Sequence, residues 1–207
     1  MHSSKTFLSL GDSYTIGESV LSSDNFPNQT VRLLRDAGYG FHDPEIIAKT
    51  GWTTDELQVA IDKSHFKNAF DFVSLLVGVN NQYRGRSVEE YKSHFETLVK
   101  HAIQLANQKA DHVIVLSIPD WGVTPFAKSR DNSDSYRQKI AGEIDSYNKA
   151  NREIAETYNV TYLDITPGTR DAANDLSLIA SDGLHPSAKE YAKWSEKIYH
   201  VIQRQLQ

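Results

Sequence analysis

The 207-residue chain contains no cysteine, and this absence excludes three kinds of chemistry at once. Without a thiol there is no disulfide framework, no thiolate zinc site and no cysteine nucleophile. A chain of this length buries about 70% of the surface that its unfolded form exposes, so it needs none of these to fold. We therefore expect a single domain over residues 1–207, built around a hydrophobic core, with no structural metal.

Long apolar runs and long basic stripes are also lacking. No apolar run reaches the roughly 18 to 20 residues that cross a bilayer, and the apolar stretch at residues 6–10 is too short for the core of a signal peptide. The formal net charge is −5, and Lys and Arg do not gather into the stripe that binding to a phosphate polymer requires. The sequence predicts a cytoplasmic protein with no membrane span and no nucleic-acid partner.

Short apolar runs alternate with amphipathic stretches, which indicates an α/β fold with a mainly parallel sheet. Strands are predicted at residues 6–10, 45–48, 70–77, 112–118 and 160–164. Helices should begin at Thr53 and Ser87 and span about 135–158 and 187–206, because capping residues and helical apolar spacing coincide there. We interpret residues 119–134 as a long irregular loop, and loops of that length are often functional.

Ligands of a parallel sheet gather at the carboxyl ends of its strands, so the residues just after each strand are candidates for a site. Ser13 follows the first predicted strand, Gly51 the second and Asn80 the third, while Asp182 and His185 precede the last helix. An imidazole held by a carboxylate activates a serine hydroxyl for acyl transfer. We predict Ser13, Asp182 and His185 as catalytic residues.

The oxyanion of such a reaction needs preorganised hydrogen-bond donors. The backbone N–H groups of Ser13 and Gly51 and the side-chain amide of Asn80 are the predicted donors. Four aromatic side chains should lie near the same rim and could bind substrate: Tyr14, Trp52, Tyr83 and Trp121. No His, Asp and Glu grouping has the spacing of a zinc site, so we expect no metal site.

At these residues the chain resembles a known family. The segment FLSLGDSY at residues 7–14 is similar to the first sequence block of the SGNH (GDSL-like) hydrolases, with Tyr14 where the name-giving motif has leucine. Gly51 resembles the second block, Gly78-x-Asn80 the third, and the Asp-x-x-His segment that ends at His185 the last. All four follow in the order of the family.

The resemblance implies a flavodoxin-like, three-layer α/β/α fold with a five-stranded, mainly parallel sheet. It also implies hydrolysis of acyl esters by the Ser13–His185–Asp182 triad, without metal or cofactor. The third block commonly continues with an acidic residue, where this chain has Asn81. We expect Asn81 to affect loop packing more than chemistry.

Simpler interpretations exist for each motif taken singly. Gly-Asp-Ser is ordinary turn sequence, and Gly51 or Asn80 could be turn residues. Asp12 beside the predicted nucleophile is better explained by a hydrogen bond that braces the loop. The Gly-x-Ser-x-Gly elbow of α/β-hydrolases is absent, because Thr15 stands at its second glycine. Glycine spacing for a nucleotide phosphate loop is absent too.

The sequence therefore predicts a serine hydrolase that cleaves small-molecule carboxylic acyl esters through an acyl-enzyme, with short acyl groups favoured. A lysophospholipase, an acyl thioesterase and a sugar O-deacetylase are alternatives on the same site. A catalytically silent binding protein of the same fold and a flavodoxin-like nucleotide module are alternatives of other classes. Because 207 residues leave little chain for a lid, we expect a shallow, open site.

Overall fold

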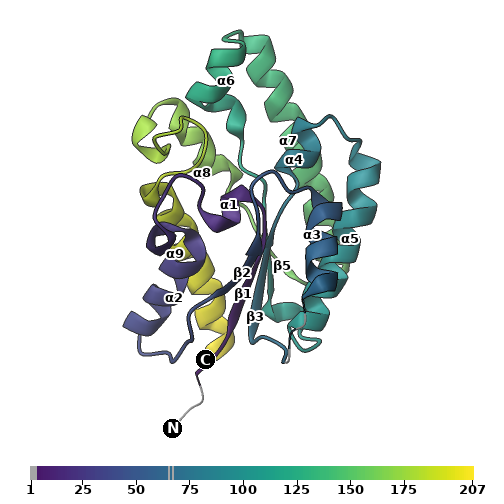
Figure 1. The fold of residues 1–207 in the computed structure, drawn as a ribbon, viewed down its shortest axis with the longest axis vertical. Coiled ribbons are helices and arrows are strands. Elements are labelled where there is room, and N and C mark those ends of the chain that lie inside the picture. Colours follow the sequence, from purple (N-terminus) through teal and green to yellow (C-terminus); the bar gives the residue numbers. More distant parts are fainter. Residues whose placement is uncertain (1–3, 65, 67) are drawn as a thin grey trace.

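The computed structural model describes residues 4–64, 66 and 68–207. Its five strands form one sheet in the order β2-β1-β3-β4-β5, and each neighbouring pair runs parallel (Figure 1). The strands are β1 (Phe7–Gly11), β2 (Glu45–Ala48), β3 (Phe72–Leu76), β4 (Val113–Leu116) and β5 (Thr161–Leu163). Each lies at a predicted run, so the predicted sheet is confirmed.

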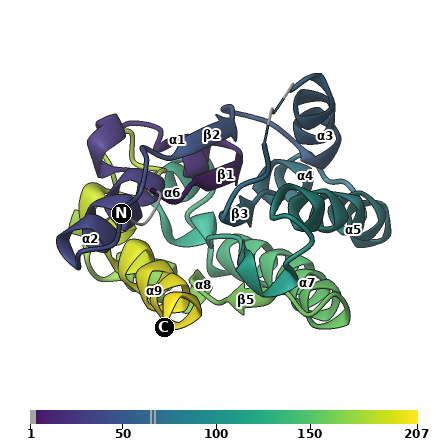
Figure 2. The same ribbon diagram turned by 90° about the horizontal axis from the view of Figure 1, so that it is seen from below.

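Helices cover both faces of the sheet. In Figures 1 and 2, α2 and α9 lie on one face, and α3, α5 and α7 lie on the other. The α-helices are α1 (Ser13–Ile16), α2 (Phe26–Asp36), α3 (Thr54–Lys63), α4 (Val79–Tyr83), α5 (Val88–Leu105), α6 (Pro125–Arg130), α7 (Asp134–Thr157), α8 (Thr166–Arg170) and α9 (Ala188–Leu206). The predicted three-layer α/β/α architecture is confirmed.

Burial explains the apolar character of the central strands. Every residue of β1, β3 and β4 is buried, as expected of a parallel sheet that is covered on both faces. The edge strand β2 is partly exposed and begins with the exposed Glu45, which is why its apolar run is shorter. The sheet thus presents a rigid row of carboxyl ends on which α1, α4 and the loops after β2 and β4 are placed.

The packing of α2 against α9 closes one face of the core. Phe26 of α2 lies 6.2 Å from Trp194 and 6.5 Å from Tyr191 of α9, measured between ring centroids. The sequence analysis did not predict α2, although Asn25 caps it and Pro27 lies in its first turn. Burying three large aromatic rings stabilises this contact, since each ring removes about 150 to 250 Å² from water.

One prediction about the chain was wrong. Residues 119–134 are not an irregular loop, because they contain a 3₁₀ turn at Trp121–Val123, the helix α6 and the start of α7. Asp120 accepts a hydrogen bond from the N–H of Gly122, and Thr124 caps α6 at its N-terminus. These side-chain caps satisfy backbone groups that a loop of that length would otherwise leave to water.

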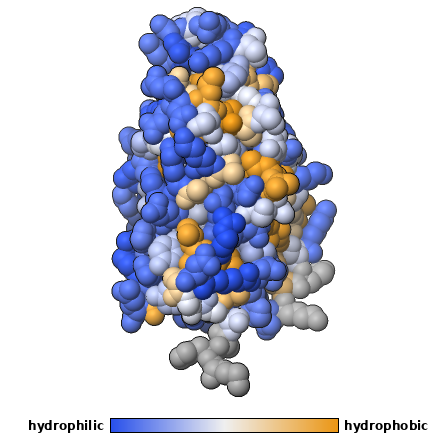
Figure 3. Space-filling view, turned by 90° about the vertical axis from the view of Figure 1, so that its left-hand side faces the viewer, coloured by the Kyte–Doolittle hydropathy of each residue, from blue (hydrophilic) through white to orange (hydrophobic). Residues whose placement is uncertain are grey.

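The outer surface carries no large apolar area on the face that Figure 3 presents. That face, on the α2 and α9 side, is largely hydrophilic with separate small apolar groups. Among the described residues, none of the helices has both the length and the apolar character to cross a bilayer.

Candidate active site

Ser13 stands at the first position of α1, immediately after the carboxyl end of β1. Asp12 caps this short helix, because its Oδ1 accepts a hydrogen bond of 3.0 Å from the N–H of Tyr14. The bracing contact predicted for Asp12 is confirmed. Gly17 ends α1 in the left-handed region, with φ +77°. The hydroxyl of Ser13 is therefore held at the sheet edge by a helix that is fixed at both ends.

Asp182 and His185 belong to a tight turn before α9. Oδ1 of Asp182 accepts the N–H groups of Leu184 at 2.9 Å and His185 at 3.0 Å. Gly183, between them, has φ +74°, which glycine adopts without strain. The carbonyl of Gly183 accepts the N–H of Phe126 at 2.9 Å, which ties the turn to α6.

These elements bring the three predicted catalytic side chains into one hydrogen-bonded series. Nε2 of His185 lies 3.0 Å from Oγ of Ser13, and Nδ1 of His185 lies 2.6 Å from Oδ2 of Asp182. With Nδ1 as the donor to the carboxylate, Nε2 is left as the acceptor of the serine proton. The arrangement is that of a nucleophile, a base and a group that orients the base.

The carboxyl group of Asp182 is held ionised by its surroundings. Its partial burial raises the pKa, but hydrogen bonds from His185, from two backbone N–H groups and from the Ser19 hydroxyl outweigh this and lower the pKa to about 2. Oγ of Ser19 lies 2.8 Å from Oδ2 of Asp182. Ser19 has φ +66°, a left-handed conformation that is uncommon outside glycine. The sequence analysis missed Ser19, since no local pattern links it to Asp182.

Asp12 has the opposite electrostatic character. Burial raises the pKa of its carboxyl group to about 7, although the N–H groups of Tyr14 and Gly78 lower it in part. Its Oδ2 has no hydrogen-bond partner among the described residues. Because the Asp182 carboxylate contacts His185 and Asp12 contacts the backbone of its own loop, Asp182 is the residue placed to orient the imidazole.

Two of the predicted donor residues, Gly51 and Asn80, line the same cleft as Ser13. The side-chain amide of Asn80, in α4, donates one hydrogen bond of 2.9 Å to the carbonyl of Trp52, which leaves its second N–H for another acceptor. Gly51 has φ +85°, so its turn favours glycine. At Gly78 (φ +135°) a Cβ would lie 2.7 Å from Ile118 and Tyr91, so only glycine fits before α4.

A cleft of about 590 Å³, partly open to solvent, lies over these groups. Ser13, Gly51, Asn80 and His185 line it together with Tyr14, Thr50, Val79, Tyr83, Trp121, Phe126 and Leu184. Trp121 and Tyr83 meet edge to face, with ring centroids 5.5 Å apart. The indole N–H of Trp121 donates to Gln82 at 2.8 Å, which fixes the ring as a wall of the cleft.

The sequence motifs now have independent support. The model of the GDSL-like lipase/acylhydrolase family matches residues 9–193, which is most of the chain. The chain belongs to this family. The family resemblance that the four sequence blocks indicated is thus confirmed. Membership of the family supports the general prediction that the protein hydrolyses esters. No curated protein matches the chain in sequence.

Solved structures share the GDSL-like fold at low sequence identity. The chain is similar to TesA, with a TM-score of 0.74 and 15% identity over 97% of this chain and 99% of that one. It is similar to Axe2, an acetylxylan esterase from Geobacillus stearothermophilus, with a TM-score of 0.70 and 18% identity over 97% and 94% of the two chains. The esterase EstA from Pseudoalteromonas sp. has a TM-score of 0.65 and 17% identity over 98% of each chain.

Of the four aromatic residues predicted to bind substrate in this GDSL-like chain, Tyr14, Tyr83 and Trp121 line the cleft. The side chain of Trp52 does not line it and borders a separate surface depression beside α3. The reason is the turn at Gly51, which presents the carbonyl of Trp52 to Asn80 instead of its indole. Leu184 and Phe126 line the cleft without having been predicted, because only the turn before α9 and the start of α6 bring them there.

Asn81, which stands where the family commonly has an acidic residue, is fully buried and bonds to the start of α3. Its Oδ1 accepts the N–H of Thr54 at 3.1 Å, and its Nδ2 donates to the Thr54 hydroxyl at 2.8 Å. These contacts hold α4 against α3 and fit the loop-packing role expected for Asn81. Within the described part of the chain, no group of three or more His, Asp or Glu side chains is placed to bind a metal ion.

Proposed function

We propose that this GDSL-like hydrolase is a serine esterase that works through an acyl-enzyme. As Oγ of Ser13 bonds to the ester carbonyl carbon, Nε2 of His185 takes the hydroxyl proton. The same proton passes to the alcohol oxygen as the bond between that oxygen and the acyl carbon breaks. Water then attacks the acyl carbon and gives a proton to His185, the acid leaves, and the proton returns to Ser13.

One observation carries this proposal. The 3.0 Å contact allows Ser13 to pass its proton to His185, and the 2.6 Å contact places the Asp182 carboxylate against the other ring nitrogen of His185. The Asp182 carboxylate, whose pKa is lowered to about 2, is ionised at neutral pH and stabilises the imidazolium that forms.

We assign the oxyanion hole to the N–H groups of Ser13 and Gly51 and the free amide N–H of Asn80. Preorganised donors of this kind act where negative charge develops, and losing one costs about 10² to 10³ in rate. The position of Ser13 at the start of α1, with its N–H outside the helical hydrogen bonds, favours this role. EstA, which shares the fold, is inhibited by monoethylphosphonate, a tetrahedral mimic of such an adduct.

Replacing Ser13 tests the proposal. Ser13→Ala should lower kcat/KM for p-nitrophenyl acetate by at least about 10³-fold, because only binding and the oxyanion donors remain. Ser146→Ala is the matched control, since Ser146 is exposed on α7 and bonds only to the carbonyl of Gly142. Ser146→Ala should keep full activity. An active Ser13→Ala enzyme with the native melting temperature would refute the serine mechanism.

For the substrate we propose esters of short acyl groups. The aromatic wall of Tyr83, Trp121 and Phe126 favours one alternative among those weighed, the removal of acetyl groups from sugars, because sugar faces pack on aromatic rings. Axe2 is described as an acetylxylan esterase and shares the fold. Acetylated xylose oligomers should be cleaved at least about tenfold better than ethyl acetate if this alternative holds, and no better if the enzyme is a simple esterase.

A further inference from the structure

The turn that carries Gly51 follows the edge strand β2 and has little support from the core, since Lys49 and Thr50 are exposed. The N–H of Trp52 bonds to the carbonyl of Lys49 at 3.2 Å, and Gly51, the third residue of the turn, has φ +85°. This is the pattern of a type II turn. The N–H of Gly51 belongs to its central peptide, which points the opposite way in a type I turn. The direction of this proposed oxyanion donor therefore depends on the groups that hold the turn.

Arg84 is one of these groups. It directly follows α4, and its Nη2 donates a hydrogen bond of 2.7 Å to the carbonyl of Gly51. Its Nη1 lies 3.3 Å from Oε2 of Glu56, and the same oxygen accepts the N–H of Thr53 at 2.9 Å. The guanidinium thus connects the turn to the first turn of α3. Because it is planar, two such contacts fix its orientation.

The same arginine is linked to a second proposed donor. The backbone N–H of Arg84 donates to the carbonyl of Asn80 at 3.0 Å. The side-chain amide of Asn80 in turn donates to the carbonyl of Trp52 at 2.9 Å. The carbonyls of Gly51 and Trp52, which follow one another along the turn, are therefore both held by the segment 80–84. This arrangement sets the positions of two proposed oxyanion donors relative to each other.

We infer that Arg84 is a positioning residue, which holds the Gly51 turn in the form that presents the Gly51 N–H to the oxyanion. This N–H makes no hydrogen bond with any described residue, so it remains available to a substrate. Arg84 does not line the cleft and acts through Gly51. The inference rests on the proposed function, because it concerns the oxyanion that forms when Ser13 attacks the ester.

A comparison of an ester with its thionoester tests the inference. The measurement is kcat/KM for p-nitrophenyl acetate and for p-nitrophenyl thionoacetate, in which sulfur replaces the carbonyl oxygen. Because sulfur is a weak hydrogen-bond acceptor, the thionoester gains little from oxyanion donors, and the ester-to-thionoester ratio reports on those donors. A general loss of active enzyme lowers both values equally and cancels in the ratio.

Replacing Arg84 should lower this ratio. For Arg84→Ala we expect a fall of about three- to tenfold, which is part of the loss of roughly 10² to 10³ that follows removal of a whole donor. The fall should appear in kcat with little change in KM, since the donors act mainly in the transition state. Arg84→Lys keeps a donor for the Gly51 carbonyl and should restore part of the ratio. Asn80→Ala removes a donor outright and is the positive control, with a larger fall.

Arg86→Ala is the matched control for a structural effect. Arg86 lies two residues further along the chain and pairs with Asp55, so it also ties this segment to α3, but it makes no hydrogen bond to Gly51. Arg86→Ala should keep the wild-type ratio even where its melting temperature falls as far as that of Arg84→Ala. Arg84→Met, which has an extended side chain without a donor, is measured beside Arg84→Ala and replaces it if thermal unfolding shows that the alanine variant does not fold.

A folded Arg84→Ala or Arg84→Met enzyme with the wild-type ratio overturns the inference, and so does an equal fall in Arg86→Ala. Failure of the proposed function gives different results. If hydrolysis persists in Ser13→Ala, the serine mechanism fails, and if Asn80→Ala keeps the wild-type ratio, the proposed oxyanion hole fails. If both of these variants behave as proposed and the ratio of the Arg84 variants does not move, only the role of Arg84 fails.

Discussion

Asp182 uses its two carboxylate oxygens for different purposes. Oδ1 accepts the N–H groups of Leu184 and His185 and so closes the turn, while Oδ2 bonds to the imidazole of His185. The same side chain thus folds the backbone around His185 and orients its ring. This double use explains in physical terms why the aspartate and the histidine stand three residues apart.

Ser19 completes the surroundings of Asp182, and its replacement should weaken catalysis modestly. Ser19→Ala removes a 2.8 Å hydrogen bond to Oδ2, the oxygen that also holds His185. Because this bond is exposed to solvent, we expect kcat/KM for p-nitrophenyl acetate to fall only about threefold.

Ser19→Gly provides the matched control for this prediction. It also lacks the hydroxyl and should lose the same activity. Because glycine adopts φ +66° without strain, the Ser19→Gly protein should unfold at a higher temperature than the Ser19→Ala protein. Equal losses of activity with unequal melting temperatures would identify the hydroxyl as the functional part. Full activity in both variants would show that Ser19 has no positioning role.

Asp12 should make stability depend on pH in an unusual direction. Burial raises the pKa of its carboxyl group from 3.8 to about 7, so the folded protein binds a proton that the unfolded chain releases above about pH 4. The stabilising contribution of Asp12 is complete below pH 4 and is lost as the pH rises towards 7. Relative to wild type, Asp12→Asn should therefore gain up to a few kcal/mol in the free energy of unfolding between pH 4 and 7.

Urea denaturation of the two proteins at several pH values measures this difference. Asn is a suitable substitute because its Oδ1 still accepts the N–H of Tyr14. Taking the difference in unfolding free energy between the two proteins cancels the contributions of other carboxylates. Asp182 is one of these, because its lowered pKa makes stability fall as the pH falls, and only at lower pH. A constant difference from pH 4 to 7 would mean that Asp12 ionises normally.

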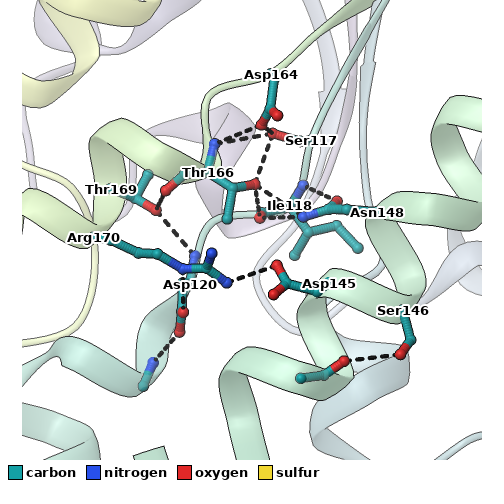
Figure 4. A network of polar contacts seen from close by, with 12 residues as sticks. Ser117, Ile118, Asp120, Asp145, Ser146, Asn148, Asp164, Thr166, Thr169 and Arg170 are labelled. Atoms are coloured by element: carbon teal, nitrogen blue, oxygen red, sulfur yellow. Dashed lines mark hydrogen bonds and ion pairs between the residues drawn. The ribbon is translucent and has the colours of Figure 1, made fainter. Parts of the chain in front are cut away.

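At the scale of elements, an ion pair with α8 holds the segment between β4 and α7 in place. Asp120 is 3% exposed and forms an ion pair with Arg170 of α8, which also reaches Asp145 of α7 at 2.7 Å (Figure 4). Asp120 in turn caps the turn that carries Trp121. The aromatic wall of the cleft therefore depends on a charge pair that lies outside the cleft.

Replacing Arg170 should lower the free energy of unfolding more than replacing another surface arginine does. Arg170→Ala leaves the Asp120 carboxylate buried without its cation, and we expect a loss of about 2 to 3 kcal/mol in the free energy of unfolding. Arg152→Ala breaks the exposed pair with Asp164 and should cost less than about 1 kcal/mol. Chemical denaturation followed by tryptophan fluorescence measures both, and equal losses would contradict the anchoring role of Asp120.

Local chemistry made most elements predictable. The apolar runs of β3 and β4 and the caps at Thr53 and Ser87 act within a few residues of the element that they specify. The sequence predicts a loop over residues 119–134 and therefore misses α6, and it misses α2 because the polar face of that helix interrupts the apolar spacing. In both cases tertiary packing, more than intrinsic propensity, stabilises the helix.

At the scale of the whole molecule, the site depends on contacts between distant parts of the chain. Ser13 and His185 are 172 residues apart in sequence, and the parallel sheet with α9 packed against α2 brings them to 3.0 Å. Motifs identified both residues, because each has a local signature. Ser19 and Leu184 have no such signature, since only the folded arrangement places them beside the site.

The most direct test of Ser13 as the nucleophile is covalent labelling of the folded chain with a fluorophosphonate, followed by mapping of the modified peptide by mass spectrometry. We predict one adduct, on Ser13, that is absent from Ser13→Ala, strongly slowed in His185→Ala and lost when the protein is unfolded in urea. Ser146→Ala should label as wild type does. The absence of an adduct from folded, native protein, or an adduct on another residue, would contradict the assignment of Ser13 as the nucleophile.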